Sequence, residues 1–155
     1  VSLRAVSSAK SAAAALSLRP PPDWQAAYAL IAELRGDHSA VVDLVGPEVM
    51  AADANEEDRA YQTLISLMLS SQTRDQVTFA TMDKLLAHGL SVSNILATED
   101  SKLHELIQKV SFHNNKVGFI KRTTQLLAER HGGRVPDLLS DLLELPGVGP
   151  KMALI

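Results

Sequence analysis

The chain has 155 residues, of which 46% are hydrophobic, so it is long enough to bury the core of one domain. It contains no cysteine, which excludes disulfides and thiolate metal sites within these residues. Its five histidines are never three or four positions apart, so a helical zinc site is not expected. No apolar run approaches the roughly 20 residues that span a bilayer, and we expect a soluble protein.

The net charge of −3 does not indicate a nucleic-acid partner, but the charges are unevenly distributed. Residues 23–72 carry nine acids and two bases, whereas residues 102–151 carry eight bases and five acids. A basic second half is typical of a surface that meets a phosphate backbone. A solvated helical surface accounts for the same pattern equally well, so both interpretations stay open at this point.

The composition of the first 22 residues differs from that of the rest. This segment contains Arg4, Lys10 and Arg19, no acid, and many serines and alanines. Such a composition resembles a mitochondrial transit segment, and a disordered tail is the alternative. The chain begins with valine and ends in apolar, helix-like residues, so we expect both ends to be cut ends. We therefore predict a leader over residues 1–22 and a folded domain over residues 23–155.

The apolar spacing in the first part of the domain predicts two helices separated by a loop. Asp23 follows three prolines and is placed to cap a helix that ends near Gly36. Residues 36–56 hold two glycines, a proline and many acids, and they are predicted to form the loop. Residues 57–71 carry a wide apolar stripe, which predicts a central helix. The stripe consists of Ala60, Leu64, Ile65, Met68 and Leu69.

Further helices joined by tight turns are predicted in the second part of the domain. Gly89 ends one helix, a polar turn is expected at residues 113–115, and Gly132 with Gly133 ends a long helix. No segment alternates with the two-residue period of a strand, so we predict an all-α fold, a compact bundle of short helices. The expected helices cover residues 74–88, residues 92–96, a segment capped by Asp100 or Ser101 and running to Val110, residues 117–127 and residues 136–143.

Residues 145–151 read LPGVGPK and follow a leucine-rich helix. Gly147 and Gly149 permit backbone angles that other residues resist, and Pro150 suits the first position of a new helix. The N–H groups of such a hairpin and of the new helix form an anion site at the positive helix end. The pattern predicts the hairpin of a helix-hairpin-helix element, which holds the DNA backbone without reading sequence.

Two other interpretations of this hairpin compete with DNA binding. An ordinary corner between two helices would carry the same glycines and bind nothing. The phosphate loop of nucleotide-binding enzymes needs a preceding strand and a hydroxyl residue after its lysine. Here a helix precedes, the glycines are too close together, and Met152 follows Lys151, so the phosphate loop is excluded.

The segment LPGVGPKMA, residues 145–153, resembles the helix-hairpin-helix signature of the endonuclease III family of DNA glycosylases. Upstream, SLMLSSQTRDQVT at residues 66–78 is similar to a helix and wedge loop of that family, and HGGRVP at residues 131–136 also matches. The resemblance covers about residues 23–155. The residues SSQT and GPKMA are more typical of eukaryotic members than of bacterial ones. It implies an all-α bundle of the helix-hairpin-helix glycosylase type.

The resemblance also implies base-excision repair of double-stranded DNA, by removal of oxidised pyrimidines and cleavage of the resulting abasic site. It places the nucleophile on Lys151, which would attack the sugar C1′, form a Schiff base and permit β-elimination. A nearby helix start favours the neutral amine that attack requires, whereas a lysine that only contacts phosphate is the alternative. The resemblance places Gln72 at the position of the family's wedge glutamine, which fills the space left by the extruded nucleotide. The alternative is a polar residue that only ends a helix. DNA-backbone binding falls on Gly147, Val148 and Gly149.

Some parts of the family pattern are not in this chain. They are a second catalytic residue, an aspartate in a VDTH-like segment, and four cysteines that hold a 4Fe-4S cluster. We expect no cofactor in these residues, a cluster in the complete gene product, and truncation within the hairpin's second helix. Without that helix, of order a few hundred Å² of apolar surface is exposed, a loss of several kcal/mol at about 25 cal/mol per Å². This chain is therefore expected to be marginally folded and weakly active or inactive.

Three functions remain in competition: a glycosylase with lyase activity, a non-catalytic DNA-binding module, and a truncated isoform without activity. Lys151 directly after GVGP separates the first from the second, because a module that only binds the backbone needs no amine there. The same lysine argues against the adenine-specific mismatch glycosylases, which have a similar hairpin but usually lack it. The resemblance further implies a monomer located in the nucleus and the mitochondrion.

Overall fold

The computed structural model describes residues 21–36, 54 and 56–155. Apart from Pro21 and Pro22, the predicted leader lies outside the described residues, as does most of the loop expected over residues 36–56. The described part of the chain contains helices and no strand, which confirms the all-α fold class. In the same part of the chain, no helix is long and apolar enough to cross a membrane.

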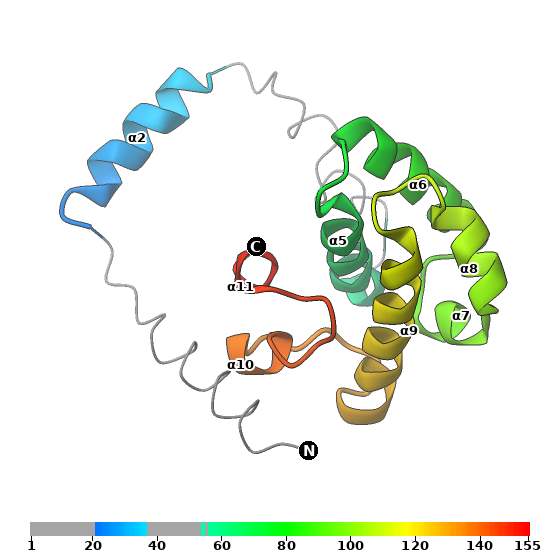
Figure 1. The fold of residues 1–155 in the computed structure, drawn as a ribbon. Coiled ribbons are helices and arrows are strands. Elements are labelled where there is room, and N and C mark those ends of the chain that lie inside the picture. The colour runs from blue at the N-terminus through cyan, green and yellow to red at the C-terminus, as the bar shows by residue number, and fades with distance from the viewer. Residues whose placement is uncertain (1–20, 37–53, 55) are drawn as a thin grey trace.

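Helix α5 (Glu56–Ser70) is the centre of the bundle (Figure 1). Its apolar residues recur every three or four positions, so they share one wide face. That face packs against α6 and α9 and carries several completely buried side chains. The central helix was therefore predicted correctly, except that Ala60 is exposed and Tyr61 takes its place in the core. The buried apolar residues of α5 are Tyr61, Leu64, Ile65, Leu67, Met68 and Leu69.

Helices α6 (Asp75–His88), α7 (Val92–Ala97) and α8 (Asp100–Ile107) cover one side of the bundle (Figure 1). Gly89 ends α6 with φ of 94°, as predicted. Ser91 caps α7 by accepting the N–H of Asn94 at 3.3 Å. The cap expected for α8 is wrong: Asp100 is already helical, and Glu99 occupies the cap position without a side-chain hydrogen bond.

Helix α9 (His113–Arg130) packs against α5, α7 and α8 and is the longest helix described. The polar turn predicted at residues 113–115 is wrong, because these residues form its first turn. The chain reverses one residue earlier, where Phe112 adopts φ of 56°. At the other end, the N–H of Gly133 donates to the Leu127 carbonyl at 2.9 Å, so the glycine pair ends the helix as predicted.

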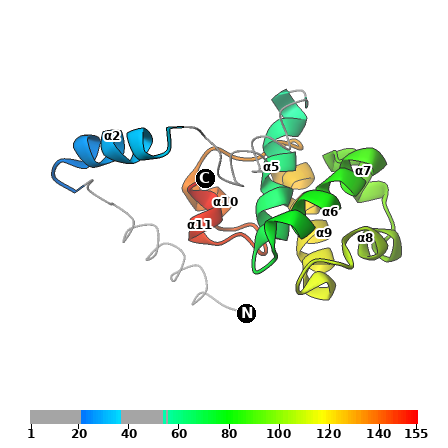
Figure 2. The ribbon, with the colours of Figure 1, turned by 90° about the horizontal axis from the view of Figure 1, so that it is seen from above.

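Two short helices complete the bundle near its C-terminal end. Helix α10 (Leu139–Leu142) is shorter than predicted, because residues 136–138 are not helical. Helix α11 (Pro150–Ala153) begins with proline at its first position, as its sequence indicated. Figure 2 shows α10 and α11 on the side of α5 opposite α7 and α8. The hairpin between α10 and α11 contacts α9, and α11 contacts α5.

Helix α2 (Trp24–Leu34) forms where its apolar spacing predicted a helix, but none of its residues is buried. Tyr28 is 68% exposed and Leu34 is 87% exposed, so its apolar face does not contribute to the described core. The cap expected from Asp23 is wrong, since that residue has φ of 60° and its side chain makes no capping hydrogen bond.

Candidate nucleic-acid interface

The chain reverses between α5 and α6 at a turn formed by Ser71, Gln72 and Thr73. The N–H of Thr73 donates to the Ser70 carbonyl at 3.0 Å, which closes the turn. Gln72 has φ of 54°, in the left-handed region, and its side chain is exposed. The left-handed conformation costs a residue with a Cβ about 1–2 kcal/mol, so other contacts must hold Gln72 in it. Gln72 is thus an exposed, conformationally constrained residue at the end of the central helix.

Phe112, between α8 and α9, has the same unusual backbone conformation. Its φ is 56°, and the residue is 62% exposed. The Phe112 carbonyl accepts the N–H groups of Asn115 and Lys116, at 3.0 and 3.1 Å, so the left-handed turn starts α9. The sequence did not predict a role for Phe112, because the reversal was expected after it. A lone large apolar residue in the polar run over residues 111–115 was the available signal.

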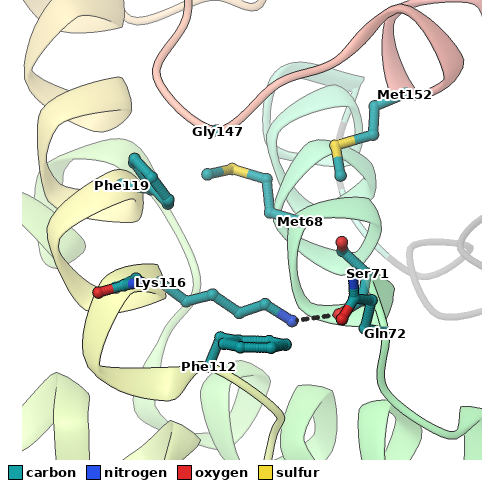
Figure 3. A pocket seen from close by; sticks show the side chains of 9 residues that line it. Met68, Ser71, Gln72, Phe112, Lys116, Phe119, Gly147 and Met152 are labelled. Carbon is teal, nitrogen blue, oxygen red and sulfur yellow. Dashed lines mark hydrogen bonds between the residues drawn. The ribbon is translucent and has the colours of Figure 1, made fainter.

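Lys116 is buried between these two turns and donates hydrogen bonds to residues on both sides of Gln72. Its Nζ donates to the carbonyls of Leu69 and Ser71, each at 2.7 Å, and to Thr73 Oγ1 at 3.3 Å. Burial lowers the pKa of the Lys116 amine to about 8. Figure 3 shows this side chain extending from α9 toward the Ser71 carbonyl, with Phe112 beside its amine. No local pattern in the sequence marks Lys116, so it was not among the predicted site residues.

Gln72 and Phe112 line one pocket, and the hairpin after α10 forms its other wall (Figure 3). The pocket has a volume of ≈ 270 Å³. Its wall combines two methionines and two phenylalanines with amide, hydroxyl and amine groups, which suits a flat ring with a polar edge. The lining residues are Met68, Ser71, Gln72, Phe112, Asn115, Lys116, Phe119, Gly147 and Met152.

The hairpin is held against α9 by two contacts. Thr123 is completely buried, and its hydroxyl donates to the Pro146 carbonyl at 2.9 Å. Gly147 has φ of 84°, and a Cβ placed on it would lie 3.0 Å from the Phe119 side chain. The Arg122 guanidinium lies 5.3 Å from the centre of that ring, on an exposed part of α9. Helix α9 therefore sets the position of the hairpin.

The other two hairpin residues behave differently from the expectation. Gly149 has extended angles, φ −103° and ψ 171°, and nothing lies within 4 Å of where a Cβ would be. The hairpin therefore uses the conformational freedom of Gly147 and not that of Gly149. The N–H of Val148 donates to the Leu145 carbonyl at 3.1 Å, and its side chain belongs to the core. Val148 consequently has no N–H to offer an anion in this conformation.

Lys151 is the second residue of α11 and is exposed. It does not line the pocket, although Met152 next to it does. Within the described part of the chain, the N–H groups of Gly149, Lys151 and Met152 donate to no backbone acceptor. Such groups at a helix start attract anions. The structure therefore brings Gln72 and Gly147 to the pocket and leaves Val148, Gly149 and Lys151 beside it.

A second lysine of α9, Lys121, donates hydrogen bonds to backbone carbonyls in a different part of the bundle. The Nζ of Lys121 donates to the carbonyls of Ile95 and Leu96, at 2.9 and 3.2 Å, at the end of α7. Lys121 also lies 3.8 Å from the Asp100 carboxylate. It is comparable to Lys116 in its bonding but remote from the Gln72 turn.

These features define a helical domain with a glycine hairpin beside a pocket that is lined by two left-handed residues. The chain is similar to known proteins in sequence and in fold. A family model, the HhH-GPD superfamily base excision DNA repair protein, matches residues 65–151. The chain is 48% identical over 134 residues to Endonuclease III-like protein 1 of Mus musculus, covering 86% of this chain and 45% of that protein. It is 40% identical over 136 residues to the Endonuclease III homolog of Schizosaccharomyces pombe, covering 86% of this chain and 38% of that protein.

Solved structures share the fold. A trapped endonuclease III–DNA covalent intermediate, in an estranged-adenine complex, superposes with a TM-score of 0.67 at 22% identity. The superposition covers 86% of this chain and 58% of that one. A non-covalent endonuclease III–DNA complex superposes with a TM-score of 0.66 at 23% identity, with 86% and 57% covered. The chain belongs to the HhH-GPD superfamily of base excision DNA repair proteins and, within it, to the endonuclease III family.

The chain spans less than half the length of the mouse and fission yeast relatives. The family resemblance implies a 4Fe-4S cluster, but the residues of this chain do not fit one. There is no cysteine in the sequence, and the described residues contain no group of three acidic or histidine side chains that could hold a metal ion. A cluster would need ligands that these 155 residues do not supply.

Proposed function

We propose that the complete protein is a base-excision DNA glycosylase with abasic-site lyase activity, acting on oxidised pyrimidines in double-stranded DNA. The observation that carries this proposal is that Gln72 and Phe112 line the same pocket, each in a left-handed conformation. Extruding a nucleotide costs a few kcal/mol, and side chains that fill the vacated stack offset that cost. An exposed amide and an exposed aromatic ring, both held in left-handed turns, are suited to this role.

The hairpin is proposed to bind a DNA phosphate next to the extruded nucleotide. Gly147 and Gly149 bring the backbone to the surface without a side chain, and Gly149 and Lys151 offer N–H groups at the start of α11. Val148 contributes by anchoring the hairpin in the core, since its N–H is already used. Binding of this kind is independent of base sequence and weakens as salt concentration rises.

Lys151 is proposed as the nucleophile. Its neutral amine attacks C1′ of the sugar, the bond from C1′ to the damaged base breaks, and the base leaves with a proton. The attached amine loses a proton, the C1′–O4′ bond breaks with O4′ taking up a proton, and C1′ and the nitrogen form a protonated Schiff base on the opened sugar. Loss of a C2′ proton then expels the 3′ phosphate by β-elimination, which nicks the strand. The exposed position of Lys151 beside the pocket leaves it accessible to a sugar whose base occupies that pocket.

Borohydride trapping tests this chemistry. The complete gene product, incubated with a duplex that carries an abasic site, should form a covalent adduct when the Schiff base is reduced. Lys151→Gln should abolish the adduct, while Lys121→Gln, at a lysine remote from the hairpin, should leave it intact. An adduct that persists in Lys151→Gln would show that another amine acts as the nucleophile.

A non-catalytic module that holds the DNA backbone is the second candidate. It is favoured by one observation, that Lys151 does not line the pocket. In that case the complete protein binds abasic DNA but gives no adduct and releases no base. The same assay applied to this chain alone tests the expectation that it is weakly active or inactive.

We infer a nuclear and mitochondrial location from the resemblance and from the basic, acid-free composition of residues 1–22. A fusion of these residues to a fluorescent protein should enter mitochondria. Substitution of Arg4, Lys10 and Arg19 by glutamine should prevent that import. A wild-type fusion that stays outside mitochondria would contradict the transit role.

A further inference from the structure

The turns that carry Gln72 and Phe112 are joined by a partly buried network of hydrogen bonds. Lys116 Nζ donates to Ser71 on one side of Gln72 and to Thr73 on the other. Thr73 Oγ1 also accepts the N–H of Ser111 at 3.2 Å, immediately before Phe112. These bonds connect residues that are 38 to 45 positions apart in the chain. A single hydroxyl and a single amine therefore link the two exposed left-handed residues.

We propose that Lys116 is a positioning residue: together with Thr73, it holds Gln72 and Phe112 at a fixed separation, so that both side chains enter the duplex as one unit during nucleotide extrusion. The inference rests on the proposed function, because it assigns a role in that reaction to a residue that the reaction does not consume. It adds a second layer to the site, behind the residues that meet DNA.

The bonding of Lys116 excludes it as a nucleophile. An ammonium group has three donors, and Leu69, Ser71 and Thr73 provide three acceptors for them. The group is buried, although its side chain forms part of the pocket wall. Attack on a sugar would require the amine to leave two backbone carbonyls at the end of α5 without a donor. The lowered pKa of Lys116 is therefore a consequence of burial and does not mark a reacting amine.

The same bonding explains how the left-handed turn at Gln72 is maintained. The Leu69 and Ser71 carbonyls lie at the C-terminal end of α5, where the helix leaves carbonyl groups without N–H partners. A cation at that end satisfies them and is favoured by the helix dipole. Removing the amine frees the Ser71 carbonyl to rotate toward another donor, and Gln72 then relaxes from its φ of 54°.

A double-mutant cycle in the complete gene product tests the proposal. The substrate is a duplex with 2-aminopurine opposite an oxidised pyrimidine, since the fluorescence of 2-aminopurine reports its unstacking. Single-turnover base release is measured on the same duplex. Lys116→Met should reduce both the fluorescence change and the rate of base release by at least tenfold. Lys116→Arg, which keeps a cation, should recover part of both.

The cycle combines Lys116→Met with Gln72→Ala. If Lys116 acts through Gln72, the double variant should be no slower than the slower single variant. Lys121→Met is the matched control, because it also removes an amine from backbone carbonyls, and its effect should multiply with that of Gln72→Ala. Multiplicative effects for Lys116→Met would show that its role is only structural and would overturn the inference.

Two further results distinguish a failure of the proposed function from a failure of Lys116→Met to fold. Wild-type protein that neither unstacks 2-aminopurine nor releases a base overturns the proposed function and the inference with it. If Lys116→Met does not fold, Thr73→Val takes its place, since it removes the shared hydroxyl and keeps the lysine. Thr73→Val should then show the same lack of multiplication with Gln72→Ala, and an unchanged rate in Thr73→Val would overturn the inference.

Discussion

Phe119 lies against the backbone of Gly147 so closely that a Cβ on Gly147 would be 3.0 Å from the Phe119 Cβ and Cγ atoms. This contact joins the hairpin, which follows α10, to the middle of α9. It explains why a glycine is needed at this position for packing as well as for its φ of 84°. The hairpin geometry therefore depends on a residue that is 28 positions earlier in the sequence.

Gly147→Ala should displace the hairpin. The added methyl group meets the Phe119 ring and must also adopt a left-handed conformation, so we expect a loss of about 1–3 kcal/mol in the free energy of unfolding. Urea denaturation measures this loss, and DNA affinity should fall with it. Gly149→Ala is the control, because its backbone is extended and the space is open, and its stability should change by only a few tenths of a kcal/mol. Equal losses in the two variants would contradict the packing role of Gly147.

Thr123→Val should weaken the second contact between the hairpin and α9. The substitution keeps the shape but leaves the Pro146 carbonyl without its donor, which should cost about 1–3 kcal/mol of unfolding free energy. Thr81→Val is the matched control, because its hydroxyl donates to the carbonyl of Val77 within the same helix. Chemical denaturation of both variants should show a clearly larger loss for Thr123→Val.

Gln72→Gly should separate stability from activity. Glycine adopts φ of 54° without strain, so unfolding free energy should stay the same or rise by up to about 1 kcal/mol. Base release should nevertheless fall at least tenfold, because no side chain fills the extruded position. Gln72→Ala should lose activity equally without the gain in stability. A wild-type rate of base release in either variant would show that the Gln72 side chain has no role in the reaction.

The stability of the wild-type protein should depend on pH through Lys116. Its pKa is about 8 in the folded chain, whereas an unfolded lysine titrates near 10.4. Between these two values the unfolded state binds more protons, so the free energy of unfolding rises with pH from about 8 to about 10. The burial cost of the charged amine is fully present below pH 8 and is relieved above it. A neutral amine still has two N–H donors for the two carbonyls at 2.7 Å.

Thermal unfolding as a function of pH measures this effect. The difference in stability between wild type and Lys116→Met should shift in favour of the wild type as pH rises through this window. Lys121→Met, which also removes an amine from backbone carbonyls, is measured alongside for comparison. A pH-independent difference for Lys116→Met would mean that the amine is solvated in the folded protein.

Local patterns in the sequence predicted most of the helices and the hairpin. The apolar period of α5, the glycine that ends α6 and the proline that opens α11 act over three or four residues, so they can be read from neighbouring positions. Errors occurred where the local signal was ambiguous. Asp100 and Asp23 looked like caps but make no capping hydrogen bond, and the polar residues after Phe112 were mistaken for the turn itself.

The sequence alone determined the all-α class, the family and the candidate residues Lys151, Gln72 and Gly147, because helix periods and the LPGVGPK motif are local. Only the tertiary structure decided that Phe112 faces the same pocket as Gln72 and that Lys116 links their turns. The packing of Phe119 against Gly147 is equally a tertiary feature. These contacts join residues 28 or more positions apart in the chain, and the helices fix such pairings only when they pack around α5 and α9. No neighbouring residue in the sequence carries that information.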